Sequence, residues 1–486
     1  MTREYDPWRN ARVFVDLAGL ESADGLTPEQ RQWASMLVDE YNRHASHNEM
    51  LLRYYDGDVS VSDYGVRADV ENDQTCHWPQ KAVDALAERI RLERFTFDEE
   101  PDVDVLASVE RDNNLVNNYN RHVSAKLLYG CMAATVTRGA SGARVRFHSA
   151  ETFTAIPSPD FEDGVVAAGL ALARRERAPW NPNEVVATVV NMHLPNNVVE
   201  LRQIEAGRWV ATQGPTPERE PSLYVFAHNG SGTLAPFGRT RITKHVRTLT
   251  DDAIRCMWHM QISGAFYSMP KLAMLNLTPD QYDAVVADKL RWQLDRVIAT
   301  ETDENGETKP DITQLNGNSP QPFVDELRAL ACQFSGATGV PLNSLGIVQD
   351  NPSSAEAIQA AREDICLVAE RDISADKATL RKVALAAMAI AENTSIERLG
   401  EAEKSVMAKF ASPMLYSLSA KADWVTKVSS VREGFGKTDV AALCMGIDEA
   451  DLPSVKSDEL REARSAVFNA IIGGAENGND TAGGAE

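Results

Sequence analysis

The chain has 486 residues and a mass of 53.3 kDa, a length that predicts about three domains rather than one. Hydrophobic residues make up 43% of it and charged residues 25%, which is typical of globular proteins and excludes a mostly disordered chain. Asp and Glu number 71 against 49 Lys and Arg, for a net charge of -22. This charge argues against a protein that grips nucleic acid by neutralising its phosphates.

The six cysteines are far apart in the sequence and form no CxxC pair. They predict neither a zinc site nor a disulfide framework, and we expect them to be reduced and mostly buried. The amino terminus, MTREYDPWRN, has no apolar signal core, and no uncharged apolar run reaches the roughly 18 residues of a membrane span. We therefore expect a protein of a cytosol-like compartment with no membrane partner.

Capping residues predict the first helix, which begins at Thr27–Gln30 with a capping box and a proline at its first position. It is expected to run to about Tyr55, before the turn signal Asp56–Asp58. Apolar spacing predicts two further helices, over Pro79–Leu92 and Val116–Leu128. Residues 1–130 are therefore expected to be helical.

The period of the apolar pattern changes between residues 140 and 237. Val145 and Phe147 alternate with polar residues, and β-prone runs follow over Val185–Val190, Val198–Leu201 and Leu223–Phe226. This pattern predicts a strand-rich layer.

Helical patterns return after the cap signal Thr250–Asp252. They predict helices over Thr250–Tyr267, Pro279–Ile298, Pro322–Gly336 and Ser354–Asn393, and a small helical cluster over Val440–Ala470. A loop rich in Gly, Pro and Asn separates the third and fourth of these helices, over Gly339–Pro352, and residues 473–486 are expected to be disordered. The predicted fold class is α+β, mainly helical.

No motif in the chain predicts catalysis. Gly434–Thr438 ends in GKT, as phosphate-binding loops do, but Val431 stands where such a loop needs a glycine, and a helix end rather than a strand precedes it. We interpret this segment as an interhelical turn, and the GASG segment Gly139–Gly142 as a turn as well. His44 and His47 lack an acidic ligand in register. We expect no enzyme, no metal and no cofactor.

Adjacent carboxylates such as Asp251 and Asp252 point about 100° apart on a helix, so we interpret them as solvated or capping groups rather than an acid/base pair.

One basic cluster stands out in the acidic chain: Arg239, Arg241, Lys244, Arg247 and Arg255. It could contact a polyanion, or it could pair with acidic side chains of a neighbouring subunit, and the sequence leaves both open. Lys244, Arg247 and Arg255 are the candidate phosphate contacts.

Several stretches occur in an order and spacing similar to those of a known family. They are Leu52–Gly57, His77–Asp84, Glu88–Ile90, Leu249–Ala253, Ser268–Pro270, Ala337–Gly346 and Asn351–Ile358. In these stretches the chain resembles the portal (head-to-tail connector) proteins of tailed bacteriophages, most strongly between Thr250 and Asp372. The resemblance implies a homododecamer, a ring of about twelve copies, at one capsid vertex.

The resemblance also implies a portal-type fold, with a wing of helices plus a β layer, a helical stem, a small α/β clip and a helical crown. The expected divisions are 1–238 wing, 239–269 stem helix, 270–319 clip, 320–338 returning stem helix, 339–353 tunnel loop, 354–435 long helix and wing return, 436–472 crown, and 473–486 tail.

A portal ring would be a structural component of the virion, assembled in the host cytoplasm, and a conduit for DNA packaging, genome retention and ejection. The implied partners are the chain itself, double-stranded DNA passing without sequence specificity, the terminase large subunit, the head-tail adaptor, and the major capsid and scaffolding proteins. The tunnel loop would present Asn343, Ser344, Gln349, Asp350 and Asn351 to the DNA channel. The clip edge, for docking partners, would hold Glu301, Asp303, Glu304 and Glu307.

Two physical features agree with this interpretation, because an acidic ring lets DNA slide and a loop rich in Gly and Pro can change conformation without melting its scaffold. Two alternatives remain. One is another ring-forming head-completion or minor capsid protein, and the other is a nucleotide hydrolase using Lys437.

Overall fold

The structure is a computed structural model. It describes residues 16–61, 73–98, 101, 105–139, 142–159, 165–178, 181–215, 220–231, 235–268, 271–275, 311–315, 319–347, 355–414, 418–447, 451, 452 and 454. The chain divides into two compact units, 1–413 and 414–486, which are described separately.

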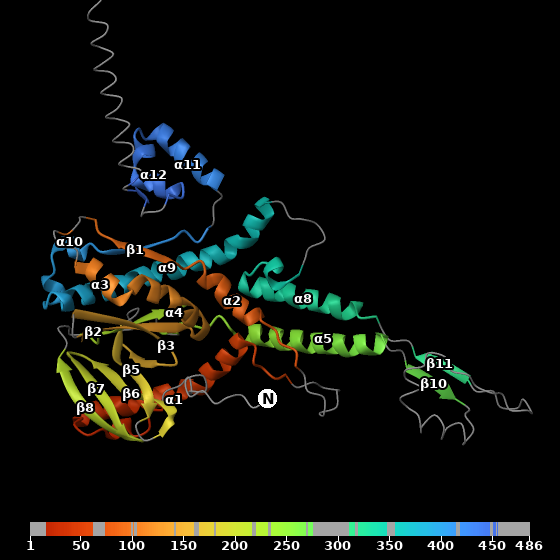
Figure 1. The fold of residues 1–486 in the computed structure, drawn as a ribbon, viewed down its shortest axis with the longest axis horizontal. Coiled ribbons are helices and arrows are strands. Elements are labelled where there is room, and N and C mark those ends of the chain that lie inside the picture. The colour runs from red at the N-terminus through yellow and green to blue at the C-terminus, as the bar shows by residue number, and fades with distance from the viewer. Residues whose placement is uncertain are drawn as a thin grey trace, which may run out of the picture. The chain divides into compact units, whose positions relative to one another are not determined.

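The first unit contains helices and antiparallel sheets (Figure 1), as the predicted α+β class requires. Its helices are η1 (Leu20–Ser22), α1 (Pro28–Asp56), α2 (Trp78–Ala87), α3 (Val105–Asn113), α4 (Leu115–Tyr129), α5 (Lys244–Ser268), α8 (Gln321–Thr338), η2 (Leu342–Leu345), α9 (Ala355–Ala391), η3 (Ile396–Arg398) and α10 (Glu401–Lys404), where η marks a 3-10 helix. Its strands are β1 (Leu92–Thr96), β2 (Cys131–Gly139), β3 (Gly142–Ser149), β4 (Phe153–Pro157), β5 (Val166–Ala178), β6 (Asn181–Leu194), β7 (Asn197–Glu205), β8 (Arg208–Pro215), β9 (Leu223–Ala227), β10 (Lys271–Leu275), β11 (Asp311–Leu315) and β12 (Met407–Phe410).

Helix α1 begins as its capping signals predict. The Thr27 side chain accepts a hydrogen bond from the Gln30 backbone amide, and the Gln30 side-chain oxygen accepts one from the Thr27 backbone amide. Pro28 is the first helical residue. Gly57, with φ of 73°, ends the helix in the left-handed region. The prediction for this helix is confirmed at both ends.

A five-stranded sheet packs against α1. Its strand order is β4-β5-β6-β7-β8, antiparallel throughout. One face of this sheet is buried against α1 and η1, through Ala168, Leu170, Val190, Met192 and Leu201 among others. The strand-rich layer is therefore confirmed, although strands β2, β4, β5 and β8 were not expected individually.

A second sheet, in the order β3-β2-β9, is covered by α4 and α9. The core between them includes Tyr119, Leu127, Val136, Phe226 and Leu380, each at most 1% exposed. Gly139 pairs with Gly142 where β2 ends and β3 begins, as the predicted turn requires, and the two residues between them lie outside the described residues. Helix α9 matches the expected long helix closely and runs through this core.

Two expected boundaries are wrong. The second helix ends at Ala87, not at Leu92, because Leu92 begins β1 and pairs with Phe410 of β12. Helix α5 begins at Lys244, with the Thr243 side chain accepting from the Val246 amide, so Thr250 is an interior residue that donates to the Val246 carbonyl. The expected helix at 279–298 lies outside the described residues.

The second unit contains α11 (Leu418–Val431), η4 (Phe435–Lys437) and α12 (Asp439–Cys444). The GKT segment forms η4 between two helices, and the Thr438 side chain caps α12 by accepting from the Ala441 amide. The predicted interhelical turn is confirmed. The boundary between units falls after Pro413, because α11 packs with η4 and α12. The expected start of the crown at residue 436 stays a prediction.

The six cysteines are free. Cys76, Cys256 and Cys366 are buried, Cys131 and Cys444 are half-buried, and Cys332 is exposed. Among the described residues, no helix combines the length and the apolar composition that crossing a membrane would need.

Candidate functional site

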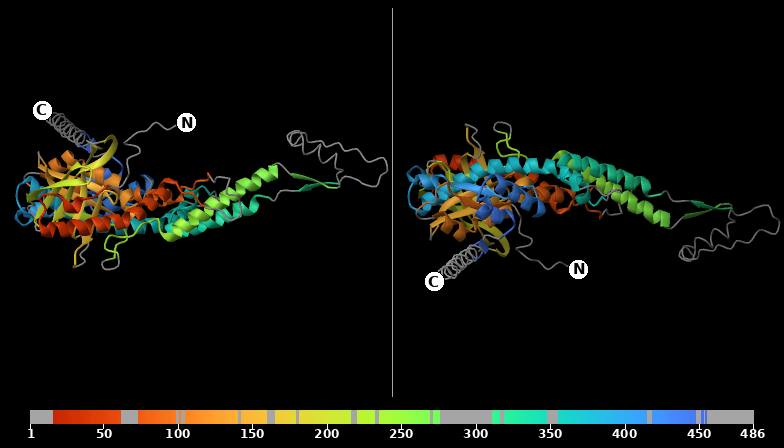
Figure 2. Two further views of the ribbon diagram at one scale, coloured as in Figure 1. Left: turned by 90° about the horizontal axis from the view of Figure 1, so that it is seen from below. Right: turned by 90° about the horizontal axis from the view of Figure 1, so that it is seen from above.

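Helices α5 and α8 of the first unit lie side by side (Figure 2). With 25 residues, α5 is about 37 Å long. Strand β10, which follows α5, pairs antiparallel with strand β11, which precedes α8, from Lys271 opposite Leu315 to Leu275 opposite Asp311. The Cys256 thiol lies 3.2 Å from the Phe323 carbonyl oxygen and ties the two helices together.

Arg241, a member of the basic cluster, anchors the base of this helix pair. Its guanidinium donates to the backbone carbonyl of Ala82, at 2.8 Å, and to that of Thr338. Its own amide donates to the carbonyl of Leu127. Burial lowers the pKa of Arg241 to about 10. Arg241 is therefore a structural link between α2, α4 and α8.

The candidate phosphate contacts differ in their surroundings. Arg255 forms an ion pair with Asp252 of its own helix, at 2.8 Å. Arg247 is half-buried, with Nη1 3.6 Å from the sulfur of Met50. Lys244 and Arg239 are exposed. The cluster is therefore divided between cations with internal contacts and exposed cations.

The expected tunnel loop begins as an anchored turn rather than as a free segment. Gly339, with φ of 69°, ends α8, and η2 follows at Leu342–Leu345. Val340 is fully buried and Leu345 is 9% exposed, both in the main core. Asn343 and Ser344 are exposed, and the other three expected channel residues, Gln349, Asp350 and Asn351, lie outside the described residues. So do the four expected clip-edge acids, Glu301, Asp303, Glu304 and Glu307.

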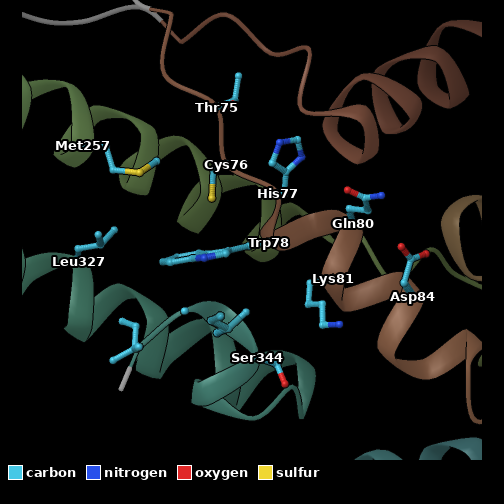
Figure 3. A pocket seen from close by; sticks show the side chains of 13 residues that line it. Thr75, Cys76, His77, Trp78, Gln80, Lys81, Asp84, Met257, Leu327 and Ser344 are labelled. Atoms are coloured by element: carbon cyan, nitrogen blue, oxygen red, sulfur yellow. The ribbon is translucent and has the colours of Figure 1, made fainter. Parts of the chain in front are cut away.

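A cavity of about 430 Å³ opens where this turn meets α2, α5 and α8 (Figure 3). The Trp78 indole extends between Met257 of α5 and Leu327 of α8, and its ring centre lies 5.3 Å from that of Phe334. The other walls of the cavity come from Thr75–His77, Gln80, Lys81, Asp84 and Ser344–Ile347. We call this the Trp78 pocket. Any movement of the turn changes a wall of this pocket.

The Trp78 pocket and its surroundings unite several of the stretches that carry the family resemblance. Tyr55 donates a hydrogen bond to Asp84 at 2.9 Å, and Tyr54 donates to Asp251 at 2.9 Å. Burial first, and then the Asp84 carboxylate, raise the pKa of Tyr55 to about 12. Stretches from four separate parts of the sequence therefore contact one another here. Asp251 and Asp252 have different partners, so they do not form an acid/base pair, but the expectation that they cap a helix is wrong, because both lie inside α5.

Sequence reasoning missed a buried ion cluster in the core, formed by Tyr119, Lys126, His228, Asp372 and Asp376. Each is at most 5% exposed. Lys126 lies 2.6 Å from Asp376 and 3.4 Å from Asp372, His228 Nδ1 lies 2.6 Å from Asp372, and Tyr119 donates to Asp376.

The ion cluster connects α4 and α9 with the residue that follows β9. Burial alone would lower the pKa of Lys126, but the two carboxylates raise it. Burial would raise the pKa of Asp372, but His228 and Lys126 hold it below its usual range, whereas burial keeps the pKa of Asp376 raised. Asp372 and Asp376 are four residues apart in the apolar stripe of α9, which was a readable signal.

No group of His, Cys, Asp and Glu side chains within the described part of the chain could hold a metal ion. His44 does have an acidic neighbour, contrary to the sequence interpretation, because Glu40 one turn earlier lies 2.7 Å from its Nε2. This pair is an exposed contact on one helix.

Comparison with known proteins gives a partial match. No family model matches the chain. Over 138 residues it is 30% identical to the portal protein of Mycobacterium phage L5, and over 146 residues it is 29% identical to that of Mycobacterium phage D29. Part of this chain resembles phage portal proteins in sequence. The match spans 28% of this chain and about a quarter, 27%, of each relative.

Two solved structures were also found. A chain from the virion of a native gene transfer agent particle is 13% identical, with a TM-score of 0.44. A chain from the neck of an empty gene transfer agent particle, computed with C6 symmetry, is 12% identical, with a TM-score of 0.45. Both alignments cover 82% of this chain and 93% of the other, and both scores are too low to establish a shared fold.

Proposed function

We propose that this chain is a phage portal protein, one subunit of a ring of about twelve at a capsid vertex, which acts as a conduit for DNA during packaging, retention and ejection. The observation that carries the proposal is the 30% identity over 138 residues to a mycobacteriophage portal protein. The contacts among the resembling stretches around the Trp78 pocket support it, because they give those stretches one structural location.

In this proposal α5 and α8 form the stem, and the strands β10 and β11 begin the clip. Residues 1–238 and the strands and helices after α9 form the wing, and the crown belongs to the second unit. The packing of α5 on α8 and the division of the chain after Pro413 support these assignments.

Duplex DNA would pass through the ring with few lasting contacts. The net charge of -22 keeps the duplex from binding by counterion release. Because Arg255 is paired with Asp252 and Arg247 is half-buried, Lys244 is the most available of the three candidate phosphate contacts.

Gating would fall to the loop between α8 and α9. Val340 and Leu345 hold its first turn in the core, so Asn343 and Ser344 would present fixed polar groups. Gln349, Asp350 and Asn351, the other expected channel residues, follow Ile347 in the sequence. The terminase large subunit and the head-tail adaptor would dock at the acidic clip edge, and the scaffolding and major capsid proteins would contact the wing.

The experiment that tests the proposal measures the mass of the purified chain by light scattering after size exclusion, with negative-stain images of the same peak. We expect a species of about twelve times 53.3 kDa with a central hole. A monomer or dimer at all concentrations, with and without the scaffolding protein, would contradict it. A ring without a through-channel would favour a head-completion or minor capsid protein instead.

The interhelical turn at Lys437 supports the absence of nucleotide hydrolysis, since η4 follows a helix and the Thr438 hydroxyl is engaged in capping. We expect no ATP turnover above that of a Lys437→Ala variant. Turnover that this substitution abolishes would overturn the passive role.

A further inference from the structure

A second cavity of about 430 Å³ lies between the β2–β3 hairpin and the outward face of the five-stranded sheet. Successive side chains of β6 and β7 point to opposite faces of the sheet, so each strand contributes residues both to the core and to the cavity. Val190 and Leu201 point into the core against α1, whereas their neighbours Val189, Asn191 and Glu200 line the cavity. We call it the arginine cleft, because its charged lining is almost entirely basic.

Five arginines line the arginine cleft, against one carboxylate, Glu200. The arginines are Arg138, Arg144, Arg146, Arg174 and Arg202. Such a concentration is unexpected in a chain whose net charge is -22.

Three of these guanidinium groups have no carboxylate partner within the described part of the chain. Arg138 donates to the amide oxygen of Asn393, at 2.7 Å, and Arg146 donates to the carbonyl of Ala173. Arg144 is exposed and has no hydrogen bond or ion pair to another described residue. Only Arg174 and Arg202 pair with acids, namely Glu176 and Glu200.

The positive charges of the cleft outnumber its one carboxylate. Burial, and then the positive charge of Arg144, lower the pKa of Arg146. Like charges held together at a partly buried site cost free energy, which a bound anion offsets. Planar guanidinium groups match carboxylate oxygens through paired hydrogen bonds.

We propose that the arginine cleft binds a carboxylate-bearing segment of a second copy of this chain, so that it forms one half of the contact between neighbouring subunits. This inference rests on the ring of the proposed function. Each copy carries 71 acidic residues, so identical subunits repel one another unless a basic surface on one faces an acidic surface on the next. Two different surfaces in contact produce a head-to-tail arrangement, which is the type of contact that a cyclic ring requires.

Duplex DNA fits the cleft less well. Binding of a duplex draws on many phosphates at once, whereas the cleft offers a few guanidinium groups within a chain of strongly negative net charge. A short acidic segment needs only the local charge.

Charge reversal tests the inference on the full chain. The double variant Arg144→Glu with Arg174→Glu changes two exposed side chains of the cleft, and Arg43→Glu on α1, whose side chain is 68% exposed, is the matched control outside it. One measurement is the affinity for a fluorescein-labelled poly-glutamate peptide. The other is the protein concentration at which half of the chain is assembled, from light scattering.

We expect the double variant to lose at least about tenfold in peptide affinity and to need at least about tenfold more protein for assembly, with the control close to wild type. Peptide binding that is lost without any change in assembly would overturn the second copy as the occupant. Unchanged peptide binding would overturn the cleft as a carboxylate site, and tighter competition by a short DNA duplex would assign the cleft to nucleic acid instead. If the wild-type chain does not assemble, the proposed ring fails, while the peptide measurement still decides the chemistry of the cleft.

Discussion

The buried ion cluster and the Trp78 pocket hold polar side chains in opposite ways. In the ion cluster, Lys126 and Asp376 are at most 1% exposed and each bonds to other members of the cluster. Around the Trp78 pocket, groups such as Lys81 and Ser344 border an open cavity of about 430 Å³. A buried charge without its partner costs several kcal/mol, whereas an exposed one can turn to water. The first place therefore allows one arrangement of α4 and α9, whereas a polar side chain around the second can exchange its protein partner for water at little cost.

The largest effect is expected from Lys126→Met, which leaves two buried carboxylates without their cation. We expect it to lower the free energy of unfolding of the full chain by about 3–5 kcal/mol, as measured by denaturant unfolding at fixed protein concentration. Arg121→Met, at an exposed position of the same helix, is the control and should change it by less than about 0.5 kcal/mol. A Lys126→Met variant as stable as this control would show that the cluster does not hold α9 in place.

Two buried histidines, His148 and His193, should make the stability of the chain depend on pH, because burial disfavours their charged forms. His148 lies 2.9 Å from the Thr135 hydroxyl and His193 lies 2.9 Å from the Ser222 hydroxyl. Burial is the main cause that lowers the pKa of each to about 3. The unfolded chain then binds protons that the folded chain does not, so their stabilising contribution is complete above pH 6.5 and is lost as the pH falls toward 3.

Each histidine should contribute a slope of about 1.4 kcal/mol per pH unit in that window. His148→Gln should remove one such contribution from the pH dependence of unfolding, and His44→Gln, at an exposed position of α1, is the matched comparison. A pH dependence that His148→Gln leaves unaltered would mean that this imidazole is already accessible to protons in the folded chain.

Local signals in the sequence predicted the elements whose ends are set by neighbouring residues. The capping box at Thr27 and the glycine at residue 57 both act within one turn of α1, and both were read correctly. Strand β1 was missed because its partner β12 is more than 300 residues away. Strand β5, with the sequence VAAGLALARRERA, is rich in residues that favour helices, and only its neighbours in the sheet make it a strand.

The candidate site was predictable in pieces but not as a whole. Trp78 and the turn at Ser344 were both singled out by the resemblance, yet only packing of α2 on α5 and α8 brings them to one cavity. Asp372 and Asp376 share one face of α9 in the sequence pattern, but Lys126 is 250 residues from Asp376. Contacts over such separations depend on the complete fold, which no local period encodes.

A smaller effect is expected at Gly346, on the open side of the comparison. Its φ of 84° lies in the left-handed region, and no described residue other than its two chain neighbours has an atom within 4 Å of an added Cβ, so we expect the cost of a side chain there to be mainly conformational. Gly346→Ala should lower the free energy of unfolding by about 1–2 kcal/mol. Gly346→Asn should cost less, because Asn adopts this region more readily. Equal costs for the two variants would show that the turn changes conformation in response.

The smallest effect is expected from removing one hydroxyl beside the Trp78 pocket. The same Tyr→Phe change in the ion cluster compares the cost of a lost hydrogen bond in the two regions directly. Tyr55→Phe removes the 2.9 Å bond to Asp84, and because that carboxylate can turn to water we expect a loss of about 0.5–1 kcal/mol. Tyr119→Phe removes a donor from Asp376 inside the core, where no water replaces it, and should cost about 1–3 kcal/mol. Both losses are measured by denaturant unfolding. If the two are equal, burial does not distinguish the regions, and the rigidity assigned to the middle of α9 has to come from its apolar packing instead.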